Sequence, residues 1–404
     1  MMKERIQTPH PRLTRRAFCA RGLVATALGA VAPALKTTAE VLGNTGPQSG
    51  FKPEELRRME ATAAAFMEKH LVPGLSVAIA KDGRLLYARG FGVADKTNQE
   101  KVTPNHLFRI ASVSKPITAT TIFRLIEQGK LSISDKVFGT QGLLGNDYGN
   151  PRKQYVKDVT VEHLLTHTEG GWPNDGTDPM FRHTEMDHRQ LINWALANLP
   201  LQNRPGTHYA YSNFGFCVLG RIIEKLTGKP YAEAVHAEVL HPCGITGMRI
   251  SGNTLAERAA IEVMYYNQDA DGSDPYQMNV RRMDSHGGWL ATPTDLVRFL
   301  VRVDDFPTKP DILKPATIAT MTTPSAVSVN YAKGWCVNKY NNWWHSGSLP
   351  GTTTIMVRTA QQFCWAALTN TRGPGDTGGD LDRLVWDMVG KITTWPQHDL
   401  FDAA

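Results

Sequence analysis

The chain has 404 residues, a formal net charge of +6, and apolar and charged fractions of 41% and 20%. This composition, without repeats or low-complexity runs, is that of a soluble globular protein long enough to bury a large core. Residues 1–34 carry +5 of the net charge, which leaves +1 for the rest, so the charge does not indicate a nucleic-acid partner.

The N-terminus has the pattern of an export signal. TRRAF at residues 14–18 resembles the twin-arginine consensus, and an apolar run follows at residues 22–35. The run is too short and too rich in Ala and Gly to span a bilayer stably. Ala32-Pro33-Ala34 offers small residues for cleavage. We expect a twin-arginine-type signal over 1–34, with the twin-arginine machinery as a partner and a periplasmic or secreted location; the alternative is a basic N-terminus without an address.

Elements near the N-terminal end are predicted by local signals. After a flexible lead-in over 35–52, PEELRRMEATAAAFMEKH begins with Pro53 and acidic residues, which is typical of a helix start. The segments LSVAIA and RLLYARGF are joined by Lys81-Asp82-Gly83. Asp-Gly between two apolar runs predicts a β-hairpin.

From about residue 113 to 300 the pattern is largely helical, because apolar residues recur at spacings of three and four. The segments are TVEHLLTH, HRQLINWALANL, NFGFCVLGRIIEKLTG and TPTDLVRFLV. Strand patterns return in YAKGWCVNKY (331–340), NNWWHSG, TTTIMVRT and FCWAALTN, and a last helix is expected over Asp380–Ile392. These segments predict an α+β fold: one antiparallel sheet built from both chain ends, with flanking helices and an inserted, mainly helical lobe. Residues 53–404 would form one folding unit with a crevice between its lobes.

Neither a metal site nor a disulfide scaffold is predicted. His163 and His167 are spaced as in some zinc sites but lack the glutamate of H-E-x-x-H. The cysteines beyond the signal are widely spaced, and a Cys336–Cys364 bridge stays open. No cofactor is expected.

The stretch ASVSKPIT holds the first candidate site residues. Proline suits the first turn of a helix, so Pro116 places the helix start near Ser112. Lys115 then lies about one turn on, within reach of the Ser112 hydroxyl. Ser112 could equally be an N-cap, and S-x-x-K also occurs at Ser49–Lys52, within the lead-in.

Two further motifs stand in a fixed order after this one. They are Tyr211-Ser212-Asn213, just before an apolar helix, and His345-Ser346-Gly347, on or beside a strand. The ordered set resembles the serine β-lactamase and penicillin-binding-protein superfamily, and most closely its class C branch. That branch includes D-alanyl-D-alanine carboxypeptidases, D-aminopeptidases and family VIII esterases. The resemblance runs from about residue 55 to 390 and includes FRIASVSKPITA, HLLTHTEG and GGWLATPTDLVRF.

The resemblance implies a β-lactamase-like fold and an acyl-enzyme on Ser112. The base that activates Ser112 would be Lys115 if burial lowers the pKa of its amine, or Tyr211 if Lys115 stays charged. Asn213 would face Lys115 and the amide of the substrate, although it could also be a helix cap. The oxyanion would be held by the backbone N–H groups of Ser112 and Ser348.

His345 departs from the Lys-Thr-Gly of many relatives, in which the ammonium attracts a carboxylate. A histidine is mostly neutral at pH 7 but can still donate a hydrogen bond, and Ser346 can hold a carboxylate or carbonyl. We therefore expect a peptidase, amidase or esterase that acts on an ester, amide or lactam carbonyl. A β-lactamase, or a sensor that binds without turnover, is the alternative. Residues 171–188 are either a wall of the substrate site or a surface loop.

Overall fold

The structure, a computed structural model, describes residues 50–268, 270, 272–373 and 375–401. The predicted signal and the lead-in up to residue 49 lie outside the described residues. Helix α2 (Pro53–Lys69) begins at the predicted proline, with Glu54 and Glu55 in its first turn, where carboxylates favour the helix dipole. Within the described ranges, no helix combines the length and apolar character that a membrane crossing requires.

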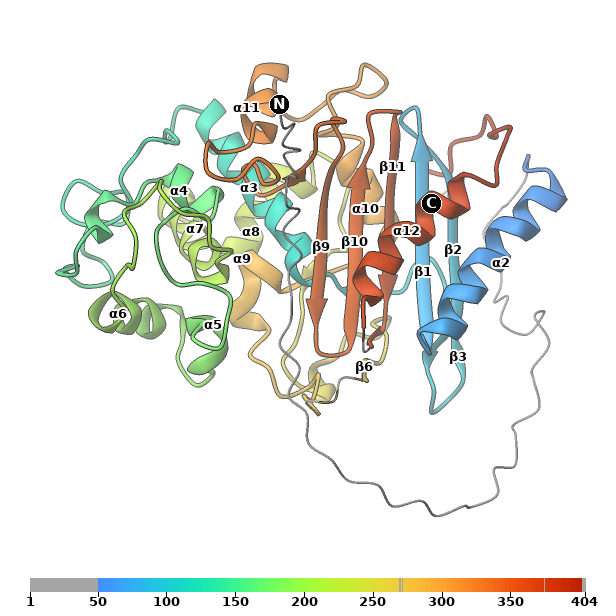
Figure 1. Ribbon diagram of the computed structural model, residues 1–404, viewed down its shortest axis with the longest axis horizontal. Helices are drawn as coiled ribbons and strands as arrows, with labels where there is room; N and C mark the ends of the chain where they lie inside the picture. Colours follow the sequence, from blue (N-terminus) through green and yellow to red (C-terminus); the bar gives the residue numbers. More distant parts are fainter. Residues whose placement is uncertain (1–49, 269, 271, 374, 402–404) are drawn as a thin grey trace, which may run out of the picture. The chain divides into compact units, whose positions relative to one another are not determined.

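The main sheet is antiparallel throughout and has the strand order β3-β2-β1-β11-β10-β9-β8 (Figure 1). The early strand β1 therefore pairs with β11 from the far end of the chain, and the predicted sheet built from both ends is confirmed. The strands are β1 (Gly74–Lys81), β2 (Arg84–Asp95), β3 (Glu100–Lys101), β8 (Cys336–Val337), β9 (Trp343–Leu349), β10 (Thr352–Arg358) and β11 (Phe363–Thr369).

The predicted hairpin joins β1 to β2. Lys81 pairs with Arg84, so the turn contains two residues. Both are left-handed, with φ of 51° at Asp82 and 74° at Gly83, as a type I′ turn requires. This turn matches the twist of the strands, and the Asp-Gly signal was therefore sufficient to predict it.

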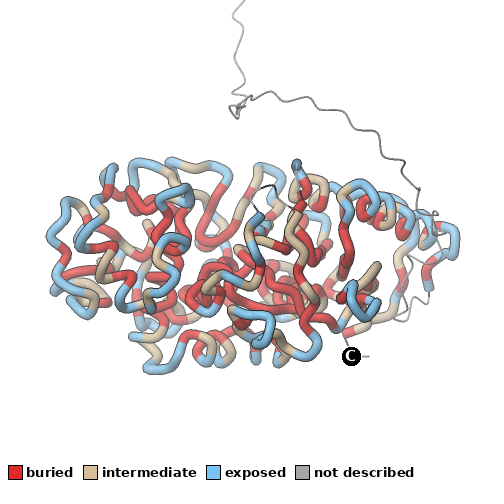
Figure 2. Tube along the Cα trace, turned by 90° about the horizontal axis from the view of Figure 1, so that it is seen from below, coloured by how far each residue is buried: buried red, intermediate tan, exposed pale blue. Residues whose placement is uncertain are grey.

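Helices cover both faces of the sheet (Figures 1 and 2). α2 and α12 (Thr377–Val389) pack on one face, against side chains such as Val77, Ile355 and Trp365. α10 (Pro293–Leu300) packs on the other face, where the alternate residues of the same strands point. The period of two in each strand therefore divides its apolar residues between two cores.

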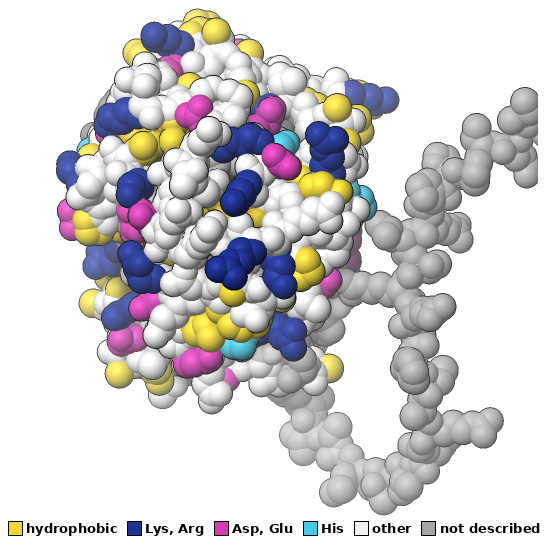
Figure 3. Space-filling view, turned by 90° about the vertical axis from the view of Figure 1, so that its left-hand side faces the viewer, with side chains coloured by type: hydrophobic (Ala, Val, Ile, Leu, Met, Phe, Trp, Pro, Cys, Tyr) yellow, Lys and Arg dark blue, Asp and Glu magenta, His cyan; other side chains and the backbone are white. Residues whose placement is uncertain are grey.

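The middle of the chain is mainly helical, as predicted. α3 (Ser114–Glu127) is buried on nearly all sides and packs against α7 and α9, which is expected of a helix inside a core. The other helices are α4 (Val161–Leu165), α5 (Pro179–Arg182), α6 (His188–Asn198), α7 (Asn213–Thr227), α8 (Tyr231–Val235), α9 (Asp284–Gly287) and α11 (Pro315–Thr322). On the face of the molecule shown in Figure 3, Lys and Arg side chains are interspersed with Asp and Glu side chains.

Short strands complete the fold. β4 (Phe108–Arg109), β7 (Trp289–Ala291) and β5 (Arg249–Ile250) form a small antiparallel sheet, whereas β6 (Tyr266–Asn267) pairs in parallel with β12 (Thr371–Arg372).

Two predicted segments differ from the structure by several residues. The strand predicted over 331–340 is reduced to β8, because the chain turns at Gly334, whose φ is 86°, and Ala332 N–H bonds to Trp335 C=O. The last helix begins at Thr377 rather than Asp380, since the Asp376 side chain caps it by accepting from Gly379 N–H. It ends at Val389 rather than at the predicted Ile392.

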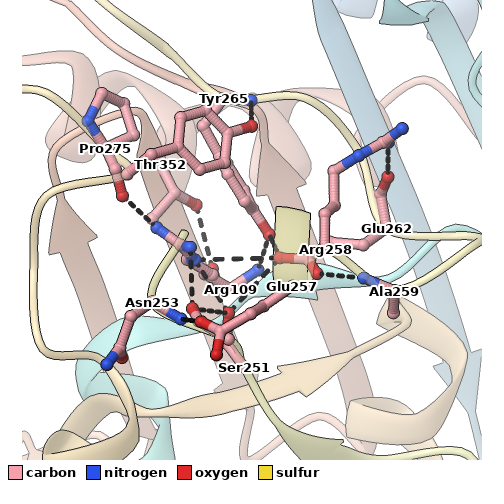
Figure 4. A network of polar contacts seen from close by, with 12 residues as sticks. Arg109, Ser251, Asn253, Glu257, Arg258, Ala259, Glu262, Tyr265, Pro275 and Thr352 are labelled. Atoms are coloured by element: carbon pink, nitrogen blue, oxygen red, sulfur yellow. Dashed lines mark hydrogen bonds and ion pairs between the residues drawn. The ribbon is translucent and has the colours of Figure 1, made fainter. Parts of the chain in front are cut away.

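A buried arginine supports the segment that leads to Ser112 (Figure 4). The Arg109 guanidinium, 1% exposed, donates to Ser251 Oγ (2.9 Å) and to the carbonyls of Gly252 (3.1 Å) and Pro275 (2.5 Å). Its Nε lies 3.7 Å from the Glu262 carboxylate. The carbonyl of Arg109 accepts from Thr352 Oγ1 of β10 at 2.9 Å. Arg109 therefore joins Ser251, Gly252, Glu262 and Pro275 to the sheet behind the nucleophile segment.

Replacing Arg109 with Met should lower the free energy of unfolding by about 3 kcal/mol, because it leaves the buried Glu262 carboxylate without its guanidinium. Urea unfolding followed by circular dichroism measures this change. Arg57→Met, at an exposed pair with Glu54, is the control and should leave the free energy of unfolding nearly unchanged. Equal stability of the two variants would contradict the supporting role of Arg109.

Candidate active site

Ser112 lies in a single 3-10 turn, Ala111–Val113, between β4 and α3. Ala111 before it has a left-handed φ of 48°, a conformation that a non-glycine residue adopts at some energetic cost. The N-cap of α3 is Val113, and no side chain caps this helix. Ser112 is therefore not an N-cap; its side chain is partly exposed and free to meet another molecule.

Lys115 lies within the first turn of α3 and is fully buried. Its Nζ is 3.1 Å from Ser112 Oγ, 2.8 Å from Asn213 Oδ1 and 2.9 Å from the carbonyl oxygen of His286. Burial lowers the pKa of the amine well below its usual value, and the charge of Asp178 opposes this shift in part. The environment therefore favours the neutral amine.

Tyr211 lies beside this pair, partly exposed. Lys115 Nζ is 4.7 Å from the centre of the Tyr211 ring and lies over its face. Burial raises the pKa of the Tyr211 phenol well above its usual value, although a hydrogen bond with the Ser112 side chain opposes the rise. The ring packs on His167 at 4.3 Å between centroids. The phenol is thus held close to Ser112 in its neutral form.

Asn213 is the first residue of α7, and the N-cap is Ser212, whose Oγ accepts from Gly215 N–H at 3.0 Å. The Asn213 side chain instead points to Lys115 and to two residues of the 171–188 loop. Its Nδ2 donates to Asn174 Oδ1 (3.0 Å) and Asp178 Oδ2 (2.9 Å). The loop therefore contributes contacts to the site, while its outer part, such as Phe181, is exposed.

His345 is buried on β9, and both of its ring nitrogens have partners. Nδ1 donates to the carbonyl of Ser346 (2.7 Å), so Nε2 accepts from the Tyr331 hydroxyl (3.2 Å). Burial, with the nearby Lys115, lowers the pKa of His345 to about 3. The imidazole is neutral, and its one N–H is already bonded within the protein.

Gly347 lets the strand approach the Ser112 turn. An added Cβ would meet the carbonyl oxygen of Ile110 and Thr354 Oγ1 far inside contact distance, and Ala111 Cβ at 3.0 Å. β9 and the Ala111–Val113 turn consequently lie side by side.

The pairing register of β9 leaves the backbone N–H and C=O groups of Ser346 and Ser348 outside the β9–β10 ladder. Leu349 and Thr352 flank a two-residue turn and form a hydrogen-bonded pair. Hydrogen-bonded and non-hydrogen-bonded pairs alternate along an antiparallel ladder, so Ser348 and Ser346 stand at non-hydrogen-bonded positions, and their backbone groups point away from β10. β8 pairs with β9 only as far as Trp344. Both serine side chains are exposed as well. The Ser348 N–H thus points away from β10, on a strand that lies beside the Ser112 turn.

The structure gathers Ser112, Tyr211 and Asn213 around the Lys115 amine, and the His345 ring lies 6.2 Å from the Tyr211 ring. His163 and His167 each accept a backbone N–H at Nδ1. The described residues contain no group of three metal-ligating side chains. Cys336 and Cys364 are free thiols, so they do not form a bridge.

Several site residues were missed in the sequence. Asn174 and Asp178 lie in the 171–188 loop and belong to no periodic pattern. Tyr331 begins the segment 331–340, which was predicted as a strand and not as part of the site, and His286 contributes a backbone carbonyl. The nearest signal was the 171–188 loop itself, given above as either a wall of the substrate site or a surface loop. Within it, Asp178-Pro179 is a helix-start pair that indicates a cap and not a contact with Asn213.

Comparison with known proteins supports a relationship over most of the chain. The family model described as Beta-lactamase matches residues 59–389. The chain is 27% identical to penicillin-binding protein 4* of Bacillus subtilis (strain 168) over 76% of this chain and 70% of the relative. It is 34% identical to esterase EstB of Burkholderia gladioli, but this match covers 50% of this chain and about half (52%) of the relative.

Among solved structures, the D-amino acid amidase from Ochrobactrum anthropi SV3 in complex with L-phenylalanine amide has the same fold. The TM-score is 0.69 at 22% identity, over 84% of this chain and 98% of the amidase.

Replacing Gly347 with Ala should separate β9 from the Ser112 turn, because the clashing atoms belong to a backbone carbonyl and a hydrogen-bonded threonine. We expect a loss of about 1–3 kcal/mol in the free energy of unfolding, measured in urea. Gly378→Ala in α12, where the nearest atom is 4.0 Å away, is the matched control and should not destabilise. An unchanged G347A protein would show that close approach of the strand is not required.

Proposed function

This chain belongs to the beta-lactamase family, and on that premise we propose that it is an exported serine hydrolase that forms an acyl-enzyme on Ser112. The main support for this proposal is the set of three polar contacts made by the Lys115 amine. A neutral amine has two N–H groups and one lone pair. The Asn213 side-chain oxygen and the His286 carbonyl oxygen accept hydrogen bonds from these two N–H groups. The lone pair can therefore accept a hydrogen bond from the Ser112 hydroxyl, whose oxygen lies 3.1 Å from Nζ.

The proposed mechanism follows from these positions. Ser112 Oγ attacks the substrate carbonyl while Lys115 accepts its proton, and the N–H groups of Ser112 and Ser348 hold the oxyanion. Tyr211, a neutral phenol near Oγ, passes a proton to the leaving group and recovers one from Lys115. Water then hydrolyses the acyl-enzyme by the same groups in reverse. Lys115, rather than Tyr211, is the base, because burial favours the uncharged form of both groups.

The substrate class follows from His345. A neutral imidazole with both nitrogens bonded to Tyr331 and Ser346 presents no positive charge to a carboxylate. We therefore propose an ester or amide without a free carboxylate next to the scissile bond, in preference to a β-lactam. Two similar proteins are an esterase and an amidase, which agrees with this choice.

Incubation with a fluorophosphonate should add one phosphonyl group to the folded protein, detected by intact mass and located at Ser112 by peptide mapping. Ser112→Ala should abolish labelling, because the attacking oxygen is lost. p-Nitrophenyl esters and amides of neutral acids should be hydrolysed faster than nitrocefin or D-alanyl-D-alanine peptides, which carry carboxylates.

The outcomes separate the alternatives. No adduct at Ser112 would refute the covalent mechanism. A stable adduct without turnover of any substrate would replace the hydrolase by a sensor that binds without turnover. Preference for nitrocefin would refute the assignment of a neutral substrate.

For export, the full chain should be found cleaved in the periplasm or medium of a bacterial host, judged by cell fractionation and immunoblotting. Arg15→Lys with Arg16→Lys should leave it uncleaved in the cytoplasm, since the twin-arginine pair is lost at constant charge. Arg12→Lys with Arg21→Lys is the matched control. Identical distribution of the two variants would refute twin-arginine export.

A further inference from the structure

Asn213 has its amide orientation determined by its neighbours. Of its three polar contacts, two are made by Nδ2, to Asn174 Oδ1 and Asp178 Oδ2, and one by Oδ1, from Lys115 Nζ. An ionised carboxylate can only accept, so Asp178 requires an N–H from Asn213 and excludes the flipped amide. The amide oxygen therefore faces Lys115 and takes one N–H of the amine.

The carboxylate of Asp178 is buried, which is unusual for a group that can carry a charge. It is 1% exposed, and both of its oxygens are bonded: Oδ1 accepts from Met180 N–H (2.9 Å) and Oδ2 from Asn213. Within the described residues, no ammonium or guanidinium lies within ion-pair distance of it. Burying an unpaired carboxylate is costly. The Asn213 amide is the link between this buried charge and the Lys115 amine.

We propose that Asp178 is a positioning residue that acts through Asn213: it aims the Lys115 lone pair at Ser112, and its negative charge sets the pH range in which Lys115 can act as a base. This inference rests on the proposed function and deepens it, because no role for Asp178 follows from the acyl-enzyme mechanism alone.

The other groups around Lys115 do not supply this charge. Burial lowers the pKa of His167, His286 and His345, so all three are neutral near pH 7. Tyr211 is neutral as well, because burial raises the pKa of its phenol. Asp178 is the carboxylate whose charge favours the protonated form of Lys115.

Around Asp178 lie Glu169, Asp175 and Arg282, besides Lys115 and Tyr211. Burial raises the pKa of Glu169 to about 8, which leaves it uncharged at neutral pH. Burial also raises the pKa of Asp178, to about 6, so its charge is present above that pH. The Arg282 guanidinium donates to three carbonyls, those of Met180, His183 and Met186.

The pKa of Lys115 determines how the labelling rate of Ser112 depends on pH. Lys115 acts as a base above its own pKa in the folded protein, and labelling of Ser112 should fall as the pH drops through that pKa. Removing the negative charge of Asp178 lowers the pKa of Lys115. The acid limb of the rate–pH profile must therefore move to lower pH.

The test is Asp178→Asn in the full chain, with the fluorophosphonate labelling rate of Ser112 measured from pH 5 to 10. The plateau rate should fall about 10- to 100-fold, because the Asn213 amide is free to flip. The acid limb should move down by about one pH unit. Asp175→Asn is the matched control: this exposed aspartate of the same loop bonds to Thr177 and should leave both quantities unchanged.

Support requires both changes in D178N and neither in D175N. A lower plateau with an unmoved limb would indicate a merely structural role and overturn the proposal, as would any other combination. If D178N does not fold, Asp178→Ser keeps an oxygen that can cap Met180 N–H and removes the charge. Failure of wild-type labelling at every pH would instead refute the proposed function itself.

Discussion

The site depends on the burial of one amine. Lys115 has no exposed surface, and a charged ammonium there would lose its hydration without gaining a directly paired carboxylate. The neutral amine satisfies the same surroundings with two donated hydrogen bonds and one accepted bond. Asn213, His286 and Ser112 together therefore provide the two acceptors and one donor that an uncharged amine can bond to.

The rest of the fold holds this amine next to an edge strand. Thr352 and Thr354 of β10 bond to the carbonyls of Arg109 and Ile110, and the Arg109 guanidinium secures the loops behind them. Gly347 then allows β9 to lie against the Ser112 turn. The sheet thus supplies rigidity, while the helical part supplies Lys115, Asn213 and their neighbours. Such a division places the reacting groups on elements that are themselves packed.

Much of the fold could be predicted, for identifiable physical reasons. The β1–β2 turn follows from Asp82-Gly83, and α7 follows from its apolar spacing and from Gly228, which ends it at a φ of 68°. These signals are local and need no partner. The prediction of a strand over 331–340 was wrong for most of its length, because the chain turns at Gly334. The pattern of side chains alone does not distinguish such a turn from an extended chain.

By itself the sequence determined the order of the S-x-x-K, Y-x-N and H-x-G motifs, and with it the family and the candidate residues. Only the tertiary structure decided the electrostatic state of those residues. Whether Lys115 is charged, whether His345 can serve as a cation, and which way Asn213 faces depend on burial and on Asp178, Tyr331 and His286, which are distant in sequence. Desolvation is a property of the assembled fold, so no local pattern of residues encodes it.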